Sequence, residues 1–451
     1  MISNLRIPWS TARKNQLLIG VNVLLTLVIA YLYSRILYHG NVNEDGGFYL
    51  ANMERIYEGF IPIKELQIGY PPVVFYLMGL IKLCFSGDAP YAAYSSLALL
   101  FQIGSGFVLF RMLSSILNHN GYSYFCVLVM LFSMYYYQGH SLFLEPFVVF
   151  FSLCALYLTL GNGALKAHYF WAGIFTGLSF LSKQYGIAVG LPMLVCVYYQ
   201  YLGEIKKTVQ PLLLILLGFS LTIALCFFLF YFNYEITLPE FYYELKSNTS
   251  YGTQSIFAAF QGFASYIVHG APFLLLVPVL FFAEPNSRSF ILTTLTGFLA
   301  FLAPTYFVQY GHYYMLIIPF SILFSAFLLT ADFPNTKLKR LVFVLTTLSL
   351  LYIPARAIKA HFWVDANSDR QGQKRIAYEI NQHIPEKSRV FLIGDPAYFY
   401  LCNFYPPQIN KMSYGYPDNF EYAFLESVIE DAPYAITSVR RVSWMQKKLG
   451  V

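Results

Sequence analysis

Of the 451 residues, 57% are hydrophobic and only 12% are charged. A soluble domain carries about 25% charged residues, so this composition excludes a soluble globular protein and predicts an integral membrane protein. The formal net charge is +6, but the basic residues lie in short clusters between apolar runs instead of on one face. That distribution argues against nucleic acid as a partner.

Apolar runs of spanning length follow one another along the chain and predict an all-α polytopic protein with about eleven transmembrane helices. The first run is too long for the hydrophobic part of a signal peptide, so we interpret it as an uncleaved helix. A further run, 72–86, is short and begins at Pro71-Pro72. The expected spans lie near residues 17–37, 90–112, 122–139, 142–160, 168–183, 184–202, 209–232, 262–283, 289–308, 312–330 and 338–356.

Basic residues predict the orientation, because short loops rich in Lys and Arg face the cytoplasm. If run 72–86 does not cross the membrane, the clusters at 206–207 and 337–340 share the cytoplasmic side with the N-terminus. We therefore predict a cytoplasmic N-terminus, two large external loops at about 39–89 and 233–261, and an external tail after Arg356. The whole of 1–356 then forms one transmembrane module.

The first external loop has the pattern of an amphipathic helix. Glu54, Arg55 and Glu58 lie on one side of this helix. Such a juxtamembrane helix is expected to lie on the outer surface of the membrane. Its apolar side is formed by Phe48, Ala51, Ile56 and Phe60.

The tail, 357–451, has the composition of a soluble segment. The pattern predicts a helix, a strand, a second helix and a second strand in that order, which is typical of a small α/β domain with a parallel pair. The four elements are expected at 373–384, 388–395, 419–430 and 433–437.

Two carboxylates are candidate catalytic residues. Asp45 follows the first span and precedes two glycines, and Glu145 lies between two apolar runs immediately before Pro146. Ionisable residues at membrane depth are costly and are functional candidates by default. Each carboxylate also has a simpler interpretation as a cap at the N-terminus of the following helix.

Three further residues are candidates for binding substrate. Lys183 lies between two apolar runs, His312 begins a late run, and Tyr70 precedes the Pro-Pro pair. Individually, the lysine could reach lipid headgroups, the histidine could be interfacial and Tyr70-Pro71-Pro72 could be a simple helix start. The predicted topology, however, places Asp45 and Glu145 on the same outer face as these residues.

The order of these motifs resembles the GT-C glycosyltransferases, in the branch of the protein O-mannosyltransferases and aminoarabinose transferases. The similarity covers most of residues 17–330 and more loosely the tail. It rests on the order and spacing of the motifs, because no single motif is specific. The motifs are Asn43-Glu44-Asp45, Gly69-Tyr70-Pro71-Pro72, Leu144-Glu145-Pro146, the glycine-rich segment from Gly173 to Lys183, and His312-Tyr313-Tyr314 with Pro319.

The resemblance implies transfer of a sugar from a polyprenyl-phosphate donor to a lipid, glycan or protein acceptor at the outer face of a bacterial plasma membrane. Asp45 would be the general base or a ligand of a divalent metal, with Glu145 as the second acid. Relatives often carry a lysine before the Pro-Pro pair to hold the phosphate, where this chain has Tyr70. The residues expected to bind substrate and phosphate are Lys183, Arg55, His312, Glu44 and Tyr70.

Two other functions use the same features. A transporter or flippase of lipid-linked saccharides would also place charges at membrane depth, but it predicts repeated halves and a site at the midplane. The sequence shows neither. An inactive scaffold of envelope assembly would tolerate the loss of Asp45, whereas the enzyme would not.

Overall fold

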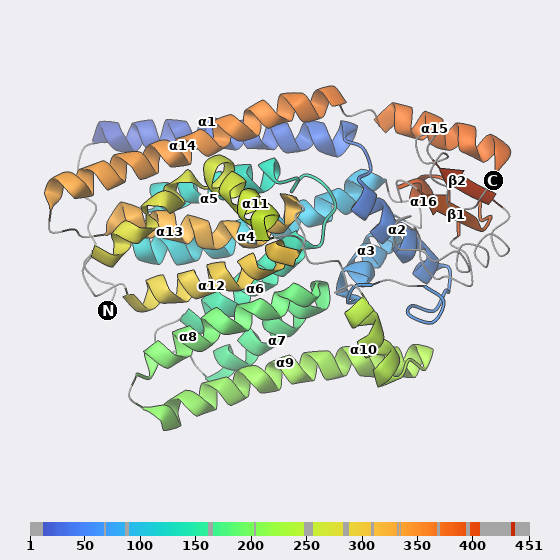
Figure 1. Cartoon of the computed structure of the whole chain (residues 1–451), viewed down its shortest axis with the longest axis horizontal. Coiled ribbons are helices and arrows are strands. Elements are labelled where there is room, and N and C mark those ends of the chain that lie inside the picture. Colours follow the sequence, from blue (N-terminus) through green and yellow to red (C-terminus); the bar gives the residue numbers. More distant parts are fainter. Residues whose placement is uncertain are drawn as a thin grey trace.

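The computed structural model describes most of the chain. The described residues are 12–66, 69–85, 90–160, 166–202, 204–247, 256–282, 288–307, 311–331, 333, 335–367, 370–393, 397–405 and 434–437. Helices dominate these residues, and in Figure 1 the long helices lie beside one another while α2, α3, α15, α16 and both strands gather at one end.

Helices follow one another along almost the whole described chain. The first half consists of α1 (Ala12–His39), α2 (Glu44–Tyr57), α3 (Val73–Cys84), α4 (Tyr91–Leu117), α5 (Asn120–Tyr136), α6 (Glu145–Leu160), α7 (Lys166–Ser182), η1 (Gln184–Val189) and α8 (Gly190–Gln200). The second half consists of α9 (Ile205–Tyr234), α10 (Leu238–Ser247), α11 (Ile256–Gly270), η2 (Pro272–Phe282), α12 (Arg288–Phe307), η4 (Gly311–Leu316), α13 (Ile318–Thr330), α14 (Thr336–Asn367), α15 (Arg370–His383), β1 (Val390–Ile393), α16 (Ala397–Leu401) and β2 (Tyr434–Thr437).

Within the described residues, 4 helices are long and apolar enough to cross a membrane, and the number is up to 5 if the bent pair α11 and η2 forms one span. This pair bends by 95°. Several other expected spans are divided into shorter helices, and a proline begins or interrupts many of them, as Pro272 does in η2. The chain is therefore a multi-pass membrane protein, and the count of about eleven spans stays a prediction.

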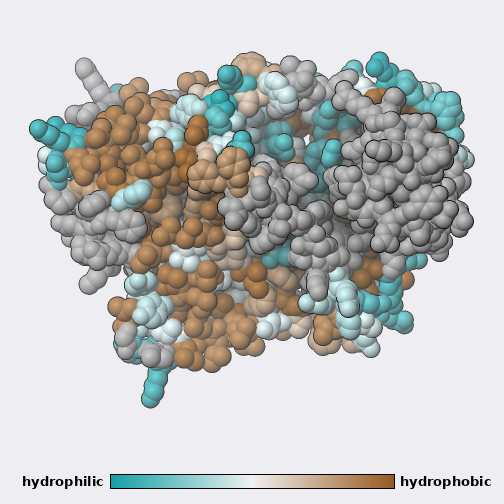
Figure 2. Space-filling model, in the orientation of Figure 1, coloured by the Kyte–Doolittle hydropathy of each residue, from teal (hydrophilic) through white to brown (hydrophobic). Residues whose placement is uncertain are grey.

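Helix α9 shows where lipid must cover the protein. Only 6% of its most apolar window is buried, although the helix has 30 residues. A water-exposed leucine surface of this length would cause aggregation, so hydrocarbon is its natural environment. Apolar residues also cover much of the face seen in Figure 2. The exposed side chains of α9 include Leu213, Leu216, Leu217, Leu221 and Leu225.

Glycines join α9 to α7. A Cβ on Gly173 would lie 2.1 Å from the carbonyl oxygen of Ile215, and a Cβ on Gly218 would lie 2.2 Å from that of Phe170. Gly173 and Gly177 are four residues apart on α7, which is the spacing of small residues that lets two membrane helices touch backbone to backbone. The glycine-rich segment noted in the sequence is therefore a helix-packing surface that leads to Lys183.

The short run 72–86 forms α3, which has 12 residues. At 1.5 Å per residue it reaches about 18 Å, well short of the roughly 30 Å of a bilayer core. The length agrees with the orientation predicted from the basic clusters. The second predicted loop, 233–261, contains α10 and the start of α11, and its residues 248–255 lie outside the described part.

Helix α2 is the amphipathic helix expected in the first loop, but its expected position on the lipid surface is wrong. Residues 46–53 are all buried, and so is Arg55. The apolar side packs into protein, with Phe48 in one core cluster and Ala51 in another. A segment of the tail covers the polar side, which no local pattern could reveal.

In the tail, α15, β1 and β2 lie where helix and strands were expected. The two strands pair in parallel, with Val390 opposite Tyr434 and Ile393 opposite Thr437. Helix α16 lies between them in sequence. The helix predicted at 419–430 lies outside the described residues, so a separate domain over 357–451 stays a prediction.

Candidate functional site

Four of the residues singled out in the sequence converge. The Lys183 ammonium donates to Glu145 Oε1 at 2.6 Å. The Nε2 atom of His312 lies 3.7 Å from Asp45 Oδ2 and 3.8 Å from Glu145 Oε1. Asp45 comes from the first turn of α2, Glu145 from the first residue of α6, Lys183 from the junction of α7 and η1, and His312 from η4. Separate parts of the chain thus meet in one cluster.

Local structure directs these side chains inward. Glu145 begins α6, where the partial positive charge of the helix N-terminus favours a carboxylate. Lys183 is extended, with φ −161 and ψ 142, so the chain breaks between α7 and η1 at the residue that carries the charge. The His312 ring stacks on Phe143, with ring centroids 4.2 Å apart.

The ion pair of Lys183 with Glu145 is buried. Glu145 is 0% exposed and Lys183 is 2% exposed. The interpretation of Lys183 as a residue that reaches lipid headgroups is therefore wrong, and so is that of His312 as an interfacial residue, because His312 is also buried. Among the described residues, the buried Glu145 Oε2 atom has no hydrogen-bond partner. An acceptor in this state is costly unless a donor reaches it.

Tyrosines surround the ammonium of Lys183. It lies 4.2 Å from the ring centroid of Tyr313, 5.3 Å from that of Tyr70 and 5.9 Å from that of Tyr185. Aromatic faces attract a cation, most strongly where water is excluded. Tyr70 therefore joins the cluster as a ring against Lys183.

Asp45 is the accessible member of the cluster. Its side chain remains 33% exposed, whereas that of Glu145 is fully buried. Burial raises the pKa of Asp45 to about 6, Lys183 opposes this rise, and Glu145 and Glu44 add to it. Glu44 itself is exposed beside Asp45 on the first turn of α2. A half-exposed carboxyl with a pKa near neutrality is suited to exchanging a proton with a substrate.

Arg55 lies elsewhere. Its Nη2 donates to the Phe404 carbonyl, and its guanidinium lies 5.2 Å from the centroid of the Phe399 ring. These contacts are with the tail, at the opposite end of α2 from Asp45. Arg55 is thus not brought to the cluster of Asp45, Glu145, Lys183 and His312.

Three aromatic residues of this region, Tyr49, Tyr185 and Phe143, were not predicted from the sequence as site residues. Tyr49 lies four residues after Asp45 on α2, and its buried hydroxyl has no hydrogen-bond partner. Burial raises its pKa well above the ordinary value, and Tyr70 adds to the effect. In the sequence, the four-residue spacing between Asp45 and Tyr49 indicates that the two side chains lie on the same side of the helix.

The described residues leave a divalent metal at Asp45 a prediction. They contain no group of three His, Cys, Asp or Glu side chains arranged to hold an ion. Glu145, which lies on the other side of His312 from Asp45, already accepts from Lys183.

No protein-family model matches the chain, and no curated protein matches it. Solved structures do. ArnT from Cupriavidus metallidurans bound to undecaprenyl phosphate has a TM-score of 0.60 at 14% identity, over 87% of this chain and 87% of that one. The apo state of the same protein gives a TM-score of 0.62 at 14% identity, over 97% and 92%. At this identity the similarity establishes the fold alone: the chain has the fold of these ArnT structures, in agreement with the GT-C resemblance drawn from the motifs.

Proposed function

We propose that the chain is a glycosyltransferase that moves a hexosyl or pentosyl group from a polyprenyl-phosphate donor to a lipid, glycan or protein acceptor, with inversion at the anomeric carbon. One observation carries the proposal. A half-exposed carboxylate, Asp45, lies beside a buried ion pair and a buried histidine at the place where separate helices meet. The ArnT structure bound to undecaprenyl phosphate supports the class of donor.

In this reaction Asp45 takes the proton of an acceptor hydroxyl. The hydroxyl oxygen forms a bond to the anomeric carbon, and the bond from that carbon to the phosphate oxygen breaks. Polyprenyl phosphate leaves with the bonding electrons and needs no proton, because it is already acidic. His312 lies between Asp45 and Glu145 and would orient the base.

Positive charge must stabilise the leaving phosphate. Lys183 is the only cation in the cluster described above, and Glu145 neutralises much of its charge. Lys183 would therefore act as part of a fixed dipole that favours the leaving group, with the Tyr70 and Tyr313 rings excluding water from it. Arg55 is not proposed for this role, because its contacts are with the tail.

We propose that the site opens on the outer face of the plasma membrane. About eleven spans, a cytoplasmic N-terminus and an external tail place Asp45 there, and the distribution of Lys and Arg supports this topology. The envelope acceptor would then approach from the external side, where the side chain of Asp45 is accessible.

The decisive experiment uses purified wild-type protein in vesicles with polyprenyl-phosphate donors that carry a radiolabelled sugar. Transfer of label to added envelope lipids, glycans or peptides supports the proposal. Movement of the intact labelled lipid across the vesicle membrane without transfer would favour a flippase instead. Neither activity with any donor would favour the scaffold.

The rate of transfer should depend on the ionisation of Asp45. Since the pKa of this group is about 6, its basic form predominates above that pH and is lost below it. We expect the initial rate at saturating donor to rise about tenfold per pH unit below pH 6 and to level off above about pH 7. A rate that is flat or falls over this range would remove Asp45 as the base.

A further inference from the structure

One stripe of α2 faces the tail. Gly47, Ala51, Arg55 and Glu58 follow one another at intervals of three or four residues, so they lie on one side of the helix. Each of them contacts the segment 387–405 or packs in the same core cluster with it. We call this surface, with Lys387 and residues 397–405 opposite, the α2–tail interface.

At the end near Asp45, the two backbones touch. A Cβ on Gly47 would lie 2.3 Å from the Cα of Ala397 and 2.8 Å from its nitrogen. No side chain fits there without moving one of the two helices. Ala51, one turn further on, is buried in a cluster with Phe399 and Phe404.

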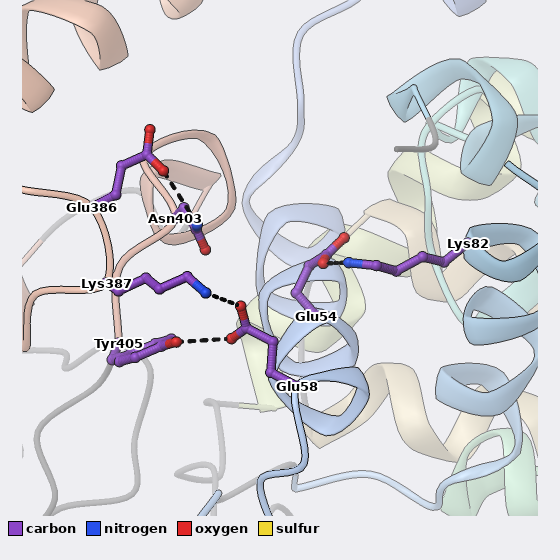
Figure 3. Close-up of polar contacts among 7 residues, drawn as sticks. All are labelled: Glu54, Glu58, Lys82, Glu386, Lys387, Asn403 and Tyr405. Carbon is purple, nitrogen blue, oxygen red and sulfur yellow. Dashed lines mark hydrogen bonds and ion pairs between the residues drawn. The ribbon is translucent and has the colours of Figure 1, made fainter. Parts of the chain in front are cut away.

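At the far end of α2, charged groups complete the α2–tail interface. Glu58 Oε1 lies 3.0 Å from the Lys387 ammonium, and Glu58 Oε2 accepts from the Tyr405 hydroxyl at 3.0 Å. Figure 3 shows both side chains pointing at Glu58 from the tail, while Glu54 faces away toward Lys82 of α3. Helix α2 is thus held between α3 and the tail.

The buried cation at this end, Arg55, has its hydrogen-bond acceptor and its aromatic neighbour in the tail. Arg55 is 2% exposed, and burial lowers its pKa to about 9. It donates to the Phe404 carbonyl, and its Nε and Nη1 atoms are buried without partners. Without residues 397–405 above it, this guanidinium would face water.

About 100° around the first turn of α2 from Gly47, Gly46 faces Leu142 in the segment that leads to Glu145. A Cβ on Gly46 would lie 3.2 Å from the Cβ of Leu142, and Asn43 accepts from the Tyr91 hydroxyl at 2.8 Å. The turn that carries Asp45 is therefore packed between this segment and α16. Because Gly46 and Gly47 have no side chains, both partners approach this turn closely.

We propose that α16 and Phe404 are a positioning element that sets the distance of Asp45 from His312 and Glu145. This inference rests on the proposed function and adds a role for the tail to it. The tail residues are positioning residues, because they do not contact the reacting groups. Docking of the tail fixes α2 along its length, and a displacement of α2 by about 1 Å would lower the rate by up to about a hundredfold.

The test uses two variants at opposite ends of the α2–tail interface. Gly47→Ala separates the backbones near Asp45, and Arg55→Met, about three turns from Asp45, removes the bond to Phe404 while keeping an unbranched side chain. Gly79→Ala is the matched control, because a Cβ on Gly79 of α3 meets nothing within 4 Å. All variants carry Cys84→Ser, since Cys84 is exposed.

Labelling of Cys402 with a membrane-impermeant maleimide reports whether the interface is intact. This thiol is buried in the same cluster as Ala51, so it should be protected in the wild type and in Gly79→Ala and labelled in the other two variants. Transfer by both opened variants should fall about ten- to a hundredfold in kcat, with KM for the donor changed by less than about threefold. The pH at half-maximal rate should move below about 6, because Asp45 becomes more solvated.

The outcomes separate the two proposals. Labelled Cys402 with wild-type kcat and pH profile would overturn the positioning role and leave the transferase intact. Gly47→Ala could lose activity while Arg55→Met keeps it, with Cys402 labelled equally in both. The effect would then come from the helix turn that carries Asp45, and the role of the tail would also be overturned. No transfer by the wild type would overturn the proposed function, and the positioning role with it.

Discussion

Replacing Asp45 by asparagine is expected to lower the rate of sugar transfer by about a hundredfold to ten-thousandfold, the range for loss of a general base. Asparagine has nearly the same shape, so the first turn of α2 should keep its packing. The amide cannot take the acceptor proton. The measurement is label transfer in vesicles, with the unfolding temperature and the elution profile as checks on folding.

The matched control for Asp45→Asn is Glu379→Gln, which changes an exposed acid on α15 in the same way. It should transfer sugar at the wild-type rate. If Asp45→Asn were as active as this control, Asp45 would have no part in the chemistry. Glu145, whose Oε2 atom has no partner, would then be the remaining carboxylate of the cluster.

Removing one partner of the buried ion pair should strongly destabilise the protein. In Lys183→Met the carboxylate of Glu145 stays buried without its cation, and in Glu145→Gln the ammonium stays buried without its anion. Loss of one member of a buried pair costs about 3–5 kcal/mol. Both single variants should unfold several degrees below the wild type in thermal melts in detergent.

The double variant Lys183→Met with Glu145→Leu separates stability from function. The double variant leaves neither partner of the ion pair charged, so its unfolding temperature should return close to that of the wild type. Sugar transfer should be lost in the double variant as in the single variants. Single variants as stable as the wild type would show that water reaches the pair. Transfer by the double variant would show that the pair is not part of the reaction.

The convergence of the site could be predicted because it depends on topology. The orientation predicted from basic residues such as Lys206 and Lys337 puts Asp45, Glu145, Lys183 and His312 at one face. Each residue alone can be explained as a helix cap or an interfacial side chain. Only the prediction that all four lie at the same face argues for a shared site. The structure then supplies what no pattern contains, the pairing of Lys183 with Glu145 at 2.6 Å.

Arg55 shows where such prediction ends. The sequence groups Arg55 with Glu54 and Glu58 as the polar side of α2, and such residues usually face water. It is buried instead by Phe399 and Phe404, more than three hundred residues later in the chain. A polar residue in a local pattern indicates that its side chain faces either water or a polar group of the protein. The pattern does not reveal that this group is a backbone carbonyl of the tail.

The hydrophobicity of the sequence also did not reveal where the helices break. The run 184–202 was expected to be one span, and it consists of η1 followed by α8. The run 262–283 bends by 95° between α11 and η2. Hydrophobicity alone cannot detect such a break, because the residues on both sides remain apolar and only hydrogen bonding changes.

The length of α9 links the thickness of the bilayer to the interior of the protein. Its 30 residues extend about 45 Å, against a hydrocarbon core of about 30 Å. The helix must tilt or stretch the surrounding lipid, and a thinner membrane increases the tilt. Because Gly173 and Gly218 bring the backbones of α7 and α9 into contact, a tilt of α9 bears directly on α7, the helix that ends at Lys183. Acyl-chain length is thus a physical variable for this protein, in the same sense as temperature or pH.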